Sequence, residues 1–313
     1  MTKRVVVPEN WQQSGKDYLT GHGMTLIEVP NEHANTLRQL GDRVDGIVYM
    51  LDPFTEDLYQ ALPNLKVIAR HGVGYDNIDP QVATKHGVYV TITPQANAST
   101  VAETTLADIL AVSKNLFQDS QHMRQGDSNY PQTHRGFDLE GKTLGIFGFG
   151  RIGQLVAQKA SALGMTILYT NPHPRETMLA KQVTFDELLQ QSDIVTLHAA
   201  VTPDTRKIMN QQAFAKMKPG ASLINLGRGA LVDETALIDA LNSKRLRAAA
   251  LDVFDEEPLP LDSPLYQFDN ILLTPHIASN TTESMNRMAI GAASEVVRVL
   301  SGEQPQWAVN KVQ

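Results

Sequence analysis

The stretch KTLGIFGFGRIGQLVAQKASAL, residues 142–163, decides the fold of the chain. It opens with a short apolar run of strand length at 143–147, and glycines follow at once with the spacing G-x-G-x-x-G. Apolar residues then recur at steps of three and four, as they do on one face of a helix. These residues are Ile152, Leu155, Val156, Ala160 and Leu163. The stretch therefore predicts a strand, a glycine-rich turn and a helix in direct succession.

Each glycine of this turn has a physical role in a dinucleotide-binding fold. Gly148 permits the tight turn, Gly150 lets the backbone approach a pyrophosphate, and Gly153 lets the helix pack closely on the strand. The N-terminus of the helix offers unpaired N–H groups and a positive dipole end to the phosphates. A glycine-rich turn without a ligand is the alternative, but the flanking strand and helix favour dinucleotide binding.

Length and composition narrow the classes of protein. The chain has 313 residues, enough for two domains, and 42% hydrophobic and 19% charged residues are typical of a globular protein. A net charge of -7 without a Lys/Arg block argues against nucleic acid as a partner. The absence of cysteine excludes disulfides and Cys-ligated metals, and we expect no metal site. No apolar run reaches signal-peptide or membrane-spanning length, so we expect a cytoplasmic protein without a membrane partner.

Short apolar runs alternate with helical stretches along the chain, which is the rhythm of a parallel α/β sheet. The first hundred residues lack a glycine fingerprint and are predicted to form a separate, smaller domain. From residue 142 the alternation resumes with six strands, as in a doubly wound sheet. The strands are predicted at 4–7, 46–50, 65–69, 88–92, 143–147, 166–169, 194–197, 222–225, 247–253 and 271–273.

Longer helices connect these regions. Residues 99–123 are predicted to form one long helix, which Ser99 or Thr100 caps with Glu103 as the capping-box partner. Residues 126–141 lack periodicity and are predicted to be an extended surface loop. A last helix is predicted over 283–300.

Polar residues follow the predicted strands of the second domain. His198, Arg228, Asp252, Glu257 and His276 each come at or shortly after a strand end. A parallel sheet brings its strand ends to one edge, which is where such sheets bind ligands. Each residue alone has a structural explanation, but their convergence beside a dinucleotide site predicts a catalytic site.

Together these side chains can carry out a coherent reaction. Hydride transfer from a nicotinamide to a ketone leaves negative charge on oxygen, and a histidine can supply the proton near neutral pH. A neighbouring carboxylate holds the histidine tautomer and favours the protonated ring. An arginine fork can clamp a substrate carboxylate in two-point contact.

With these residues in view, the chain resembles the D-isomer-specific 2-hydroxyacid dehydrogenase family over nearly its whole length. The motifs that carry the resemblance are RHGVGYDNID at 70–79, STVAETT at 99–105, GFGRIG at 148–153, NLGRGALVDE at 225–234, LDVFDEEP at 251–258 and TPHIASNT at 274–281. The resemblance implies a nicotinamide-dependent oxidoreductase that interconverts a D-2-hydroxy acid and a 2-keto acid. It also implies two α/β domains. A Rossmann doubly wound domain over 99–283 binds the cofactor, and a smaller flavodoxin-like domain over 1–98 and 284–313 binds the substrate.

The resemblance also assigns roles to residues. His276 is implied as the general acid/base, Glu257 as its carboxylate partner and Arg228 as the substrate clamp. Val73 and Gly74 are implied to bind the substrate carboxylate through their N–H groups. The implied cofactor contacts are Gly148, Gly150, Arg151, Ile152, Gly153, Asn171, Arg175, Thr105, His198, Thr202, Leu226, Asp252 and His276. Members of the family are typically homodimers, so a homodimer is expected.

One departure from the family pattern concerns the cofactor. NAD-specific members carry an Asp at the end of the second strand, whereas Asn171 stands there in this chain. Without that acid nothing repels a 2′-phosphate, and His173 and Arg175 can attract one. The Arg that NADP-preferring members often place next is Pro172 here. We therefore predict NAD or NADP as cofactor, with NADPH accepted.

Two alternatives remain at this point. Within the class, D-3-phosphoglycerate dehydrogenase is the main one, while formate oxidation is disfavoured because formate enzymes have Gln where Glu257 stands. From another class, relatives of this fold act as non-catalytic, dinucleotide-sensing corepressors. The sequence does not name the 2-hydroxy acid.

Overall fold

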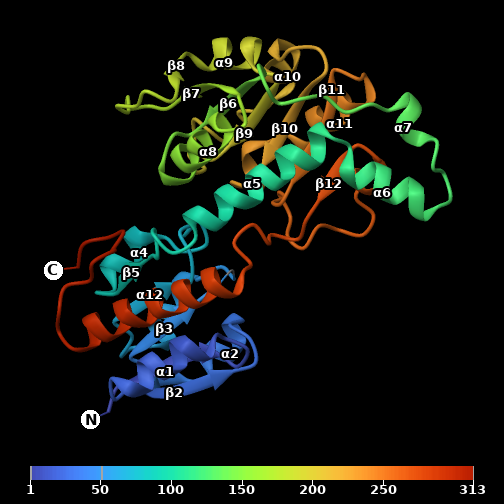
Figure 1. Ribbon diagram of the computed structural model, residues 1–313. Helices are drawn as coiled ribbons and strands as arrows, with labels where there is room; N and C mark the ends of the chain where they lie inside the picture. The colour runs from blue at the N-terminus through green and yellow to red at the C-terminus, as the bar shows by residue number, and fades with distance from the viewer. Residues whose placement is uncertain (1, 51, 313) are drawn as a thin grey trace. The chain divides into compact units, whose positions relative to one another are not determined.

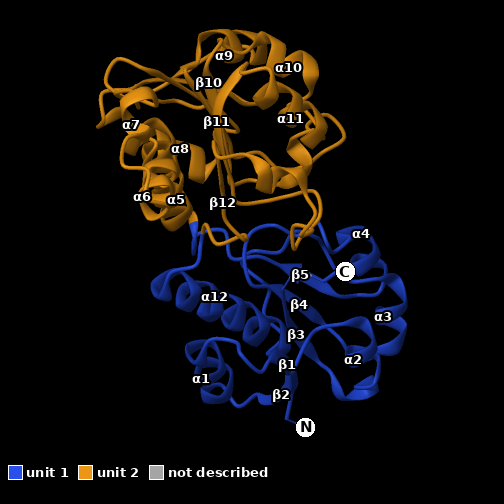
Figure 2. Ribbon diagram, turned by 90° about the vertical axis from the view of Figure 1, so that its right-hand side faces the viewer, with its two compact units in different colours: residues 1–97, 279–313 blue, residues 98–278 orange. Residues whose placement is uncertain are grey.

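The chain divides into two compact units in a computed structural model that describes residues 2–50 and 52–312 (Figure 1). Unit 1 comprises Met1–Asn97 and Ser279–Gln313, and unit 2 comprises Ala98–Ala278 (Figure 2). From the sequence, these divisions are expected at 98/99 and 283/284. Among the described residues, no helix is both long and apolar enough to cross a membrane.

Unit 1 is built on a five-stranded parallel sheet with the order β2-β1-β3-β4-β5. This is the strand order of flavodoxin, so the predicted flavodoxin-like sheet is confirmed. The strands are β1 (Arg4–Pro8), β2 (Thr25–Val29), β3 (Gly46–Tyr49), β4 (Val67–Arg70) and β5 (Tyr89–Thr91). The helices are α1 (Gln13–Gly21), α2 (Ala34–Arg38), α3 (Glu56–Ala61), α4 (Pro80–Lys85), α12 (Thr282–Leu300) and the 3-10 turn η1 (Gly41–Arg43).

Two hydrophobic clusters sandwich this sheet. Helices α1 and α12 pack on one face and α2, α3 and α4 on the other (Figure 2). Strands β3 and β4 are buried along their whole length, which explains their continuous apolar sequences. Strand β2 and helix α1 are not predicted from the sequence, for physical reasons. The strand lies at the sheet edge and is half exposed, and the helix contains Gly15 where an apolar residue would mark its inner face.

Unit 2 is built on a seven-stranded parallel sheet with the order β12-β11-β10-β9-β6-β7-β8. The chain starts at β6, extends to β7 and β8, and then returns to β9, which is the doubly wound Rossmann arrangement that the sequence predicts. The strands are β6 (Thr143–Phe147), β7 (Thr166–Thr170), β8 (Lys181–Gln182), β9 (Ile194–Leu197), β10 (Ala221–Asn225), β11 (Leu246–Leu251) and β12 (Ile271–Leu273).

Helices cover both faces of this sheet. Helices α9, α10 and α11 pack on one face, and α5 and α8 pack on the other. The helices are α5 (Ala98–Ser113), α6 (Leu116–Arg124), α7 (Tyr130–Thr133), α8 (Arg151–Ser161), α9 (Phe185–Gln191), α10 (Gln211–Lys216) and α11 (Glu234–Asn242). Two 3-10 turns, η2 (Gly229–Leu231) and η3 (Pro264–Gln267), complete the unit. The region 126–141, which was predicted to be an extended surface loop, therefore contains the short helix α7.

The single long helix predicted over 99–123 is wrong, because the chain breaks at Asn115 into α5 and α6. Asn115 adopts a left-handed conformation with φ 53°, which asparagine tolerates better than most residues. Its side chain donates to the His134 carbonyl at 2.8 Å and accepts from the Arg247 guanidinium at 2.6 Å. The predicted capping box is also wrong: Ser99 lies inside α5 and donates to the Glu103 carboxylate at 3.1 Å.

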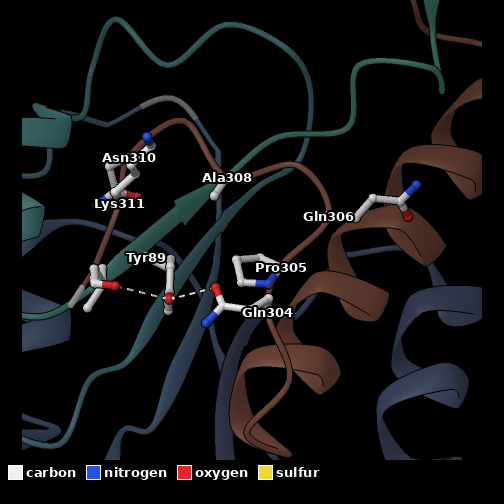
Figure 3. Close-up of a pocket in the computed structure, with 8 residues that line it drawn as sticks. Tyr89, Gln304, Pro305, Gln306, Ala308, Asn310 and Lys311 are labelled. Atoms are coloured by element: carbon white, nitrogen blue, oxygen red, sulfur yellow. Dashed lines mark hydrogen bonds between the residues drawn. The ribbon is translucent and has the colours of Figure 1, made fainter.

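The C-terminal segment covers the exposed edge of the unit 1 sheet. The Ile92 N–H donates to the Trp307 carbonyl at 3.1 Å, and the Val309 N–H donates to the Val90 carbonyl at 2.9 Å. This pairing protects an edge strand that would otherwise present unpaired backbone groups. The segment leaves a surface hollow beside β5, where the Tyr89 hydroxyl lies against Gln304 (Figure 3). The residues that line the hollow include none of those predicted to bind substrate or cofactor.

One acidic side chain interrupts the apolar face of α5. Asp108 is 6% exposed, and among the described residues its carboxyl has no hydrogen-bond partner. Helix α5 packs in the same cluster as the alanines of β11, the strand that Asp252 follows. Burial, and then the negative charge of Asp252, raise the pKa of Asp108 to about 7 from 3.8. The folded state therefore holds a proton on Asp108 that the unfolded chain releases at lower pH.

This proton makes stability depend on pH. A raised carboxyl pKa means that the folded state loses stability as the pH rises from about 4 through 7. We expect Asp108→Asn to raise the free energy of unfolding at pH 8 by roughly 2–4 kcal/mol, and by much less at pH 4. Urea unfolding at both pH values measures this difference. The exposed Asp138, which pairs with Lys114, gives the control variant Asp138→Asn, for which no gain at pH 8 is expected. An equal gain for Asp108→Asn at both pH values would contradict the interpretation.

Candidate functional site

The glycine turn after β6 leaves no room for side chains at two of its three glycines. Gly148 has φ 93°, and a Cβ there would lie 2.7 Å from the His198 carbonyl carbon. A Cβ on Gly153 would lie 2.4 Å from the Gly148 carbonyl oxygen, so glycine is needed for the helix to pack on the turn. At Gly150 nothing lies within 4 Å of a Cβ position, and this residue is the N-cap of α8. The turn is thus closed toward the protein at 148 and 153 and open to a ligand at 150.

The residues around the open position fit the phosphates of a dinucleotide. Helix α8 has 11 residues and begins with Arg151 and Ile152, so its N-terminal N–H groups adjoin Gly150. The Asn171 Oδ1, just beyond β7, accepts the Phe149 N–H at 3.1 Å and so holds the turn. The Asn171 Nδ2 donates to the His173 carbonyl at 2.7 Å. The end of β7 is thereby tied to the glycine turn through an uncharged side chain.

His198 lies beside the same turn, with a nitrogen that no described residue satisfies. The backbone N–H of His198 donates to the Phe147 carbonyl at 2.7 Å, and its ring Nε2 lies 3.0 Å from the Thr196 hydroxyl. Burial lowers the pKa of His198 to about 4, so the ring is neutral. Its Nδ1 is buried without a partner among the described residues, and a buried unsatisfied nitrogen is a candidate contact for a ligand.

Four other residues are predicted to contact the cofactor: Thr105, Thr202, Leu226 and Arg175. No hydrogen bond connects any two of these described residues. Thr105 is fully buried and donates its hydroxyl to the Val101 carbonyl at 2.7 Å, and Leu226 lies in the core between β10 and α5. Thr202 and Arg175 are exposed. Contact of these four with a cofactor stays a prediction.

His276 and Glu257 form the closest polar pair among the predicted catalytic residues. His276 Nδ1 lies 2.7 Å from Glu257 Oε2, and the Phe254 N–H donates to Glu257 Oε1 at 3.0 Å. Burial opposes ionisation of Glu257, but the hydrogen bonds from His276 and Phe254 outweigh it and hold the pKa of the carboxyl below its ordinary value. Glu257 is therefore a carboxylate at neutral pH, and Nε2 is the ring nitrogen left for a substrate.

Asp252 fixes the loop that carries His276. This carboxylate is fully buried, and it accepts hydrogen bonds from the Thr274 hydroxyl at 2.6 Å and from the Ile277 and Ala278 N–H groups, both at 2.8 Å. The Asp252 carbonyl also accepts the His276 N–H at 2.9 Å. Between these anchors His276 adopts φ 52°, a left-handed conformation that costs free energy in a residue with a side chain and persists only where the surroundings impose it. The cofactor contact expected of Asp252 stays a prediction.

Arg228 joins the pair because the next residue is glycine. A Cβ on Gly229 would lie 1.9 Å from the Phe254 carbonyl carbon, so only glycine lets the loop after β10 approach the loop that carries Glu257. Asn225 shapes this turn: it accepts the Gly227 N–H at 3.1 Å and donates to the Arg228 carbonyl at 2.9 Å. The positive charge of Arg228 contributes to the lowered pKa of Glu257. A guanidinium, a carboxylate and an imidazole thus share one edge of the unit 2 sheet.

In unit 1, the loop after β4 presents two backbone N–H groups. Gly72 has φ 145°, and its carbonyl accepts from the Thr93 N–H at 2.8 Å. Among the described residues, the N–H groups of Val73 and Gly74 have no hydrogen-bond acceptor. Two adjacent free N–H groups are suited to an anion such as a carboxylate.

Buried polar atoms without described partners gather after four strands of the unit 1 sheet. They are Gln12 Oε1 after β1, Glu32 Oε1 after β2, His71 Nε2 after β4 and Asn97 Oδ1 after β5. The carboxyl ends of parallel strands lie at one edge of the sheet, where such sheets bind ligands. Buried polar atoms normally find partners, so this edge is built for a polar ligand or ordered water. Among residues 2–50 and 52–312, no group of three or more His, Cys, Asp or Glu side chains is arranged to hold a metal ion.

Sequence reasoning missed several residues that shape these sites. An acid on the apolar face of a helix was the available signal for Asp108, and a glycine directly after Arg228 was the signal for Gly229. Nothing in the sequence indicated that the Thr274 hydroxyl binds Asp252, since that contact depends on the conformation of the loop.

Comparison with known proteins agrees with this geometry. Residues 106–278 match the family model described as D-isomer specific 2-hydroxyacid dehydrogenase, NAD binding domain. A glyoxylate reductase of Thermofilum pendens is 41% identical over 290 residues, which cover 90% of this chain and 86% of that protein. A D-3-phosphoglycerate dehydrogenase of Methanocaldococcus jannaschii is 41% identical over 82% of this chain but only 49% of its own length.

A solved structure gives the same result over both units. The crystal structure of a glyoxylate reductase from Paecilomyes thermophila is similar with a TM-score of 0.89 and 31% identity, covering 98% of each chain. The family model spans more than half of the chain, and the relatives span nearly all of it. The chain therefore belongs to the D-isomer-specific 2-hydroxyacid dehydrogenase family of NAD(P)-dependent oxidoreductases, and residues 106–278 are its NAD-binding domain.

Proposed function

We propose that this protein reduces a small 2-keto acid to the D-2-hydroxy acid, with His276 as general acid, Glu257 as its partner and Arg228 as the substrate clamp. The observation that carries the proposal is the 2.7 Å contact between His276 and Glu257 beside Arg228, on the sheet edge that also bears the glycine turn. An imidazole oriented by a carboxylate is the arrangement expected of a proton donor.

Each residue has one task in the reaction. Arg228 binds the substrate carboxylate through its guanidinium fork and so sets the direction of the carbonyl. Glu257 holds the Nδ1 proton of His276, which leaves the proton on Nε2 for the carbonyl oxygen as negative charge develops there. Gly150, Arg151 and Ile152 hold the cofactor phosphates in this proposal, which the open N-terminus of α8 at Gly150 supports. A bound nicotinamide supplies the hydride that reduces the carbonyl carbon.

The two units take different tasks in this proposal. Unit 2 binds the cofactor and carries Arg228. Unit 1 adds the N–H groups of Val73 and Gly74, which have no acceptor among the described residues, to the binding of the substrate carboxylate. The homodimer and the cytoplasmic location expected from the sequence stay predictions. Exposed Leu116 and Met123 on α6 support a subunit contact, because large apolar side chains at a surface favour association.

The first test is a substrate panel for the wild-type protein and His276→Ala. We expect oxidation of reduced cofactor with glyoxylate, hydroxypyruvate or pyruvate, and a loss of kcat of about 10²–10⁴-fold in the variant, which is the usual worth of a general acid. Absorbance at the nicotinamide band measures both. His22→Ala, at an exposed histidine of unit 1, is the matched control and should keep full activity.

The same panel separates the alternatives. Oxidation of 3-phosphoglycerate in preference to reduction of every keto acid would favour the phosphoglycerate alternative, which the relative from Methanocaldococcus jannaschii raises. Cofactor binding without turnover on the whole panel would favour the non-catalytic sensor and sink the proposal.

A second prediction concerns the pH dependence that Glu257 imposes. Because its pKa is held low, Glu257 is negative over the working range and stabilises the protonated imidazole beside it. We expect Glu257→Gln to move the alkaline limb of kcat/KM for keto-acid reduction to lower pH by about one unit. Steady-state rates from pH 5 to 9 measure the limb. Glu256→Gln, at the exposed neighbouring residue, is the control. If Glu257→Gln lowers kcat but leaves the alkaline limb of kcat/KM in place, the negative charge of Glu257 is not what supports the imidazole.

A third prediction concerns the choice between NADH and NADPH. Asn171 is neutral and still holds the Phe149 N–H, so the turn keeps its shape without a negative charge near the ribose site. The Tyr169 hydroxyl accepts the Arg175 N–H and donates to the Arg175 carbonyl, both at 3.1 Å, so the segment that carries this guanidinium is anchored. Both features support acceptance of a 2′-phosphate.

We therefore expect KM for NADPH to lie within about tenfold of KM for NADH. Asn171→Asp keeps the acceptor for Phe149 but adds a charge, and it should raise KM for NADPH by tenfold or more while KM for NADH falls or stays constant. Arg175→Gln should raise KM for NADPH alone. A hundredfold preference of the wild type for NADH would refute the prediction.

A further inference from the structure

The indole of Trp11 and the imidazole of His71 form a buried pair in unit 1. Trp11 lies between β1 and α1 and is 4% exposed, and His71 directly follows β4 and is 6% exposed. The indole Nε1 donates a hydrogen bond of 3.2 Å to His71 Nδ1. The rings meet edge to face, with centroids 6.3 Å apart and planes inclined by 79°. None of the roles assigned so far uses this pair.

The donor of this hydrogen bond is held in place by a glycine. A Cβ on Gly15 would lie 2.3 Å from the ring of Trp11, so the indole packs directly on the backbone of α1. Glycine therefore stands on the inner face of α1, where an apolar side chain would occupy the space of the indole. A donor fixed in this way selects one position for its acceptor.

The acceptor must be the unprotonated nitrogen of a neutral ring. An indole N–H only donates, so His71 Nδ1 carries no proton and Nε2 carries it. Burial, and then the positive charge of Arg70, lower the pKa of His71 to about 4, which keeps the ring neutral near pH 7. Its Nε2 is buried without a partner among the described residues. The hydrogen bond from Trp11 is therefore the contact that fixes the tautomer and the ring plane.

The backbone after His71 leads straight into the free N–H groups of the loop. The His71 N–H donates to the Tyr49 carbonyl at 3.1 Å. The Gly72 carbonyl accepts from Thr93 twice, from its N–H at 2.8 Å and from its hydroxyl at 3.2 Å. The next two N–H groups belong to Val73 and Gly74. The orientation of these groups thus depends on how firmly the chain is held at His71 and Gly72.

We propose that His71 is a positioning residue of the substrate site. By accepting the hydrogen bond of Trp11, it fixes the start of the loop that presents the Val73 and Gly74 N–H groups to the substrate carboxylate. This inference rests on the proposed function, because it takes a carboxylate as the ligand of the loop. A preoriented pair of donors binds an anion more tightly than a mobile pair, since less conformational entropy is lost on binding.

Kinetics of four variants test the proposal in the full-length protein with saturating cofactor. His71→Leu removes the acceptor and Trp11→Phe removes the donor, and each should raise KM for the keto acid about tenfold while KM for NADPH stays within about twofold. His71→Asn keeps an acceptor near the Nδ1 position and should restore KM to within about threefold of the wild type. The double variant Trp11→Phe/His71→Leu should be no worse than either single variant, as coupled residues behave.

A spectroscopic signature accompanies the kinetics. In protein labelled with ¹⁵N at tryptophan, the variant Trp11→Phe identifies the Trp11 indole N–H resonance by its absence. That N–H should exchange slowly with solvent in the wild type and in His71→Asn, and faster in His71→Leu. Trp307→Phe, at the other tryptophan, is the control for both measurements and should leave KM and the Trp11 resonance unchanged.

The outcomes separate this inference from the proposed function. An unchanged KM in His71→Leu, or an equal rise in His71→Leu and His71→Asn, overturns the positioning role while leaving keto-acid reduction in place. An equal rise of KM for keto acid and for NADPH shows that His71 only maintains the fold, and also overturns it. A wild-type protein that binds cofactor but turns over no keto acid overturns the proposed function, and the carboxylate role of the loop with it.

Discussion

The buried carboxylate of Asp252 is the constraint on which the catalytic edge of unit 2 depends. It receives three hydrogen bonds from the segment 274–278, and its own carbonyl receives a fourth. An ionised group buried without such donors would cost far more free energy than a fold of this size can spare. Because the donors come from one short segment, satisfying the charge also fixes that segment. His276 lies in its middle and takes a left-handed conformation that it would not adopt alone.

Parallel topology explains why residues far apart in the sequence meet at this edge. Gly148, His198, Arg228, Asp252 and His276 follow five strands that all run in the same direction, so their positions coincide along the strand axis. Glycines then decide the finer distances. At 148 and 229 a Cβ would collide with backbone, and these are the places where one loop approaches another. The sheet supplies the common edge, and the absence of side chains supplies the close approach.

The sequence predicts the parts of this arrangement that depend on local pattern. Buried strands such as β6 and β9 have the predicted bounds, because continuous apolar runs bounded by polar residues reflect burial on both faces. The break at Asn115 could not be predicted, since it depends on His134 and Arg247, which reach it only in the folded chain. The residue types at the edge, including His276 and Glu257, were visible in the sequence. Their spacing was not, because it follows from backbone angles and loop contacts.

Three carboxyl groups in unit 2 show how the fold assigns different charge states to the same chemical group. The buried carboxylate of Asp252 has three donors within hydrogen-bond distance, which satisfy its oxygens. Asp108 is buried near it without any described donor, and the charge of Asp252 adds to the cost of ionising it. Glu257 is partly exposed, and its hydrogen bonds favour the charged form. One group anchors the loop, one stays neutral in the core, and one remains available to the imidazole. Environments that separate carboxyl groups in this way are what acid–base chemistry requires of a protein scaffold.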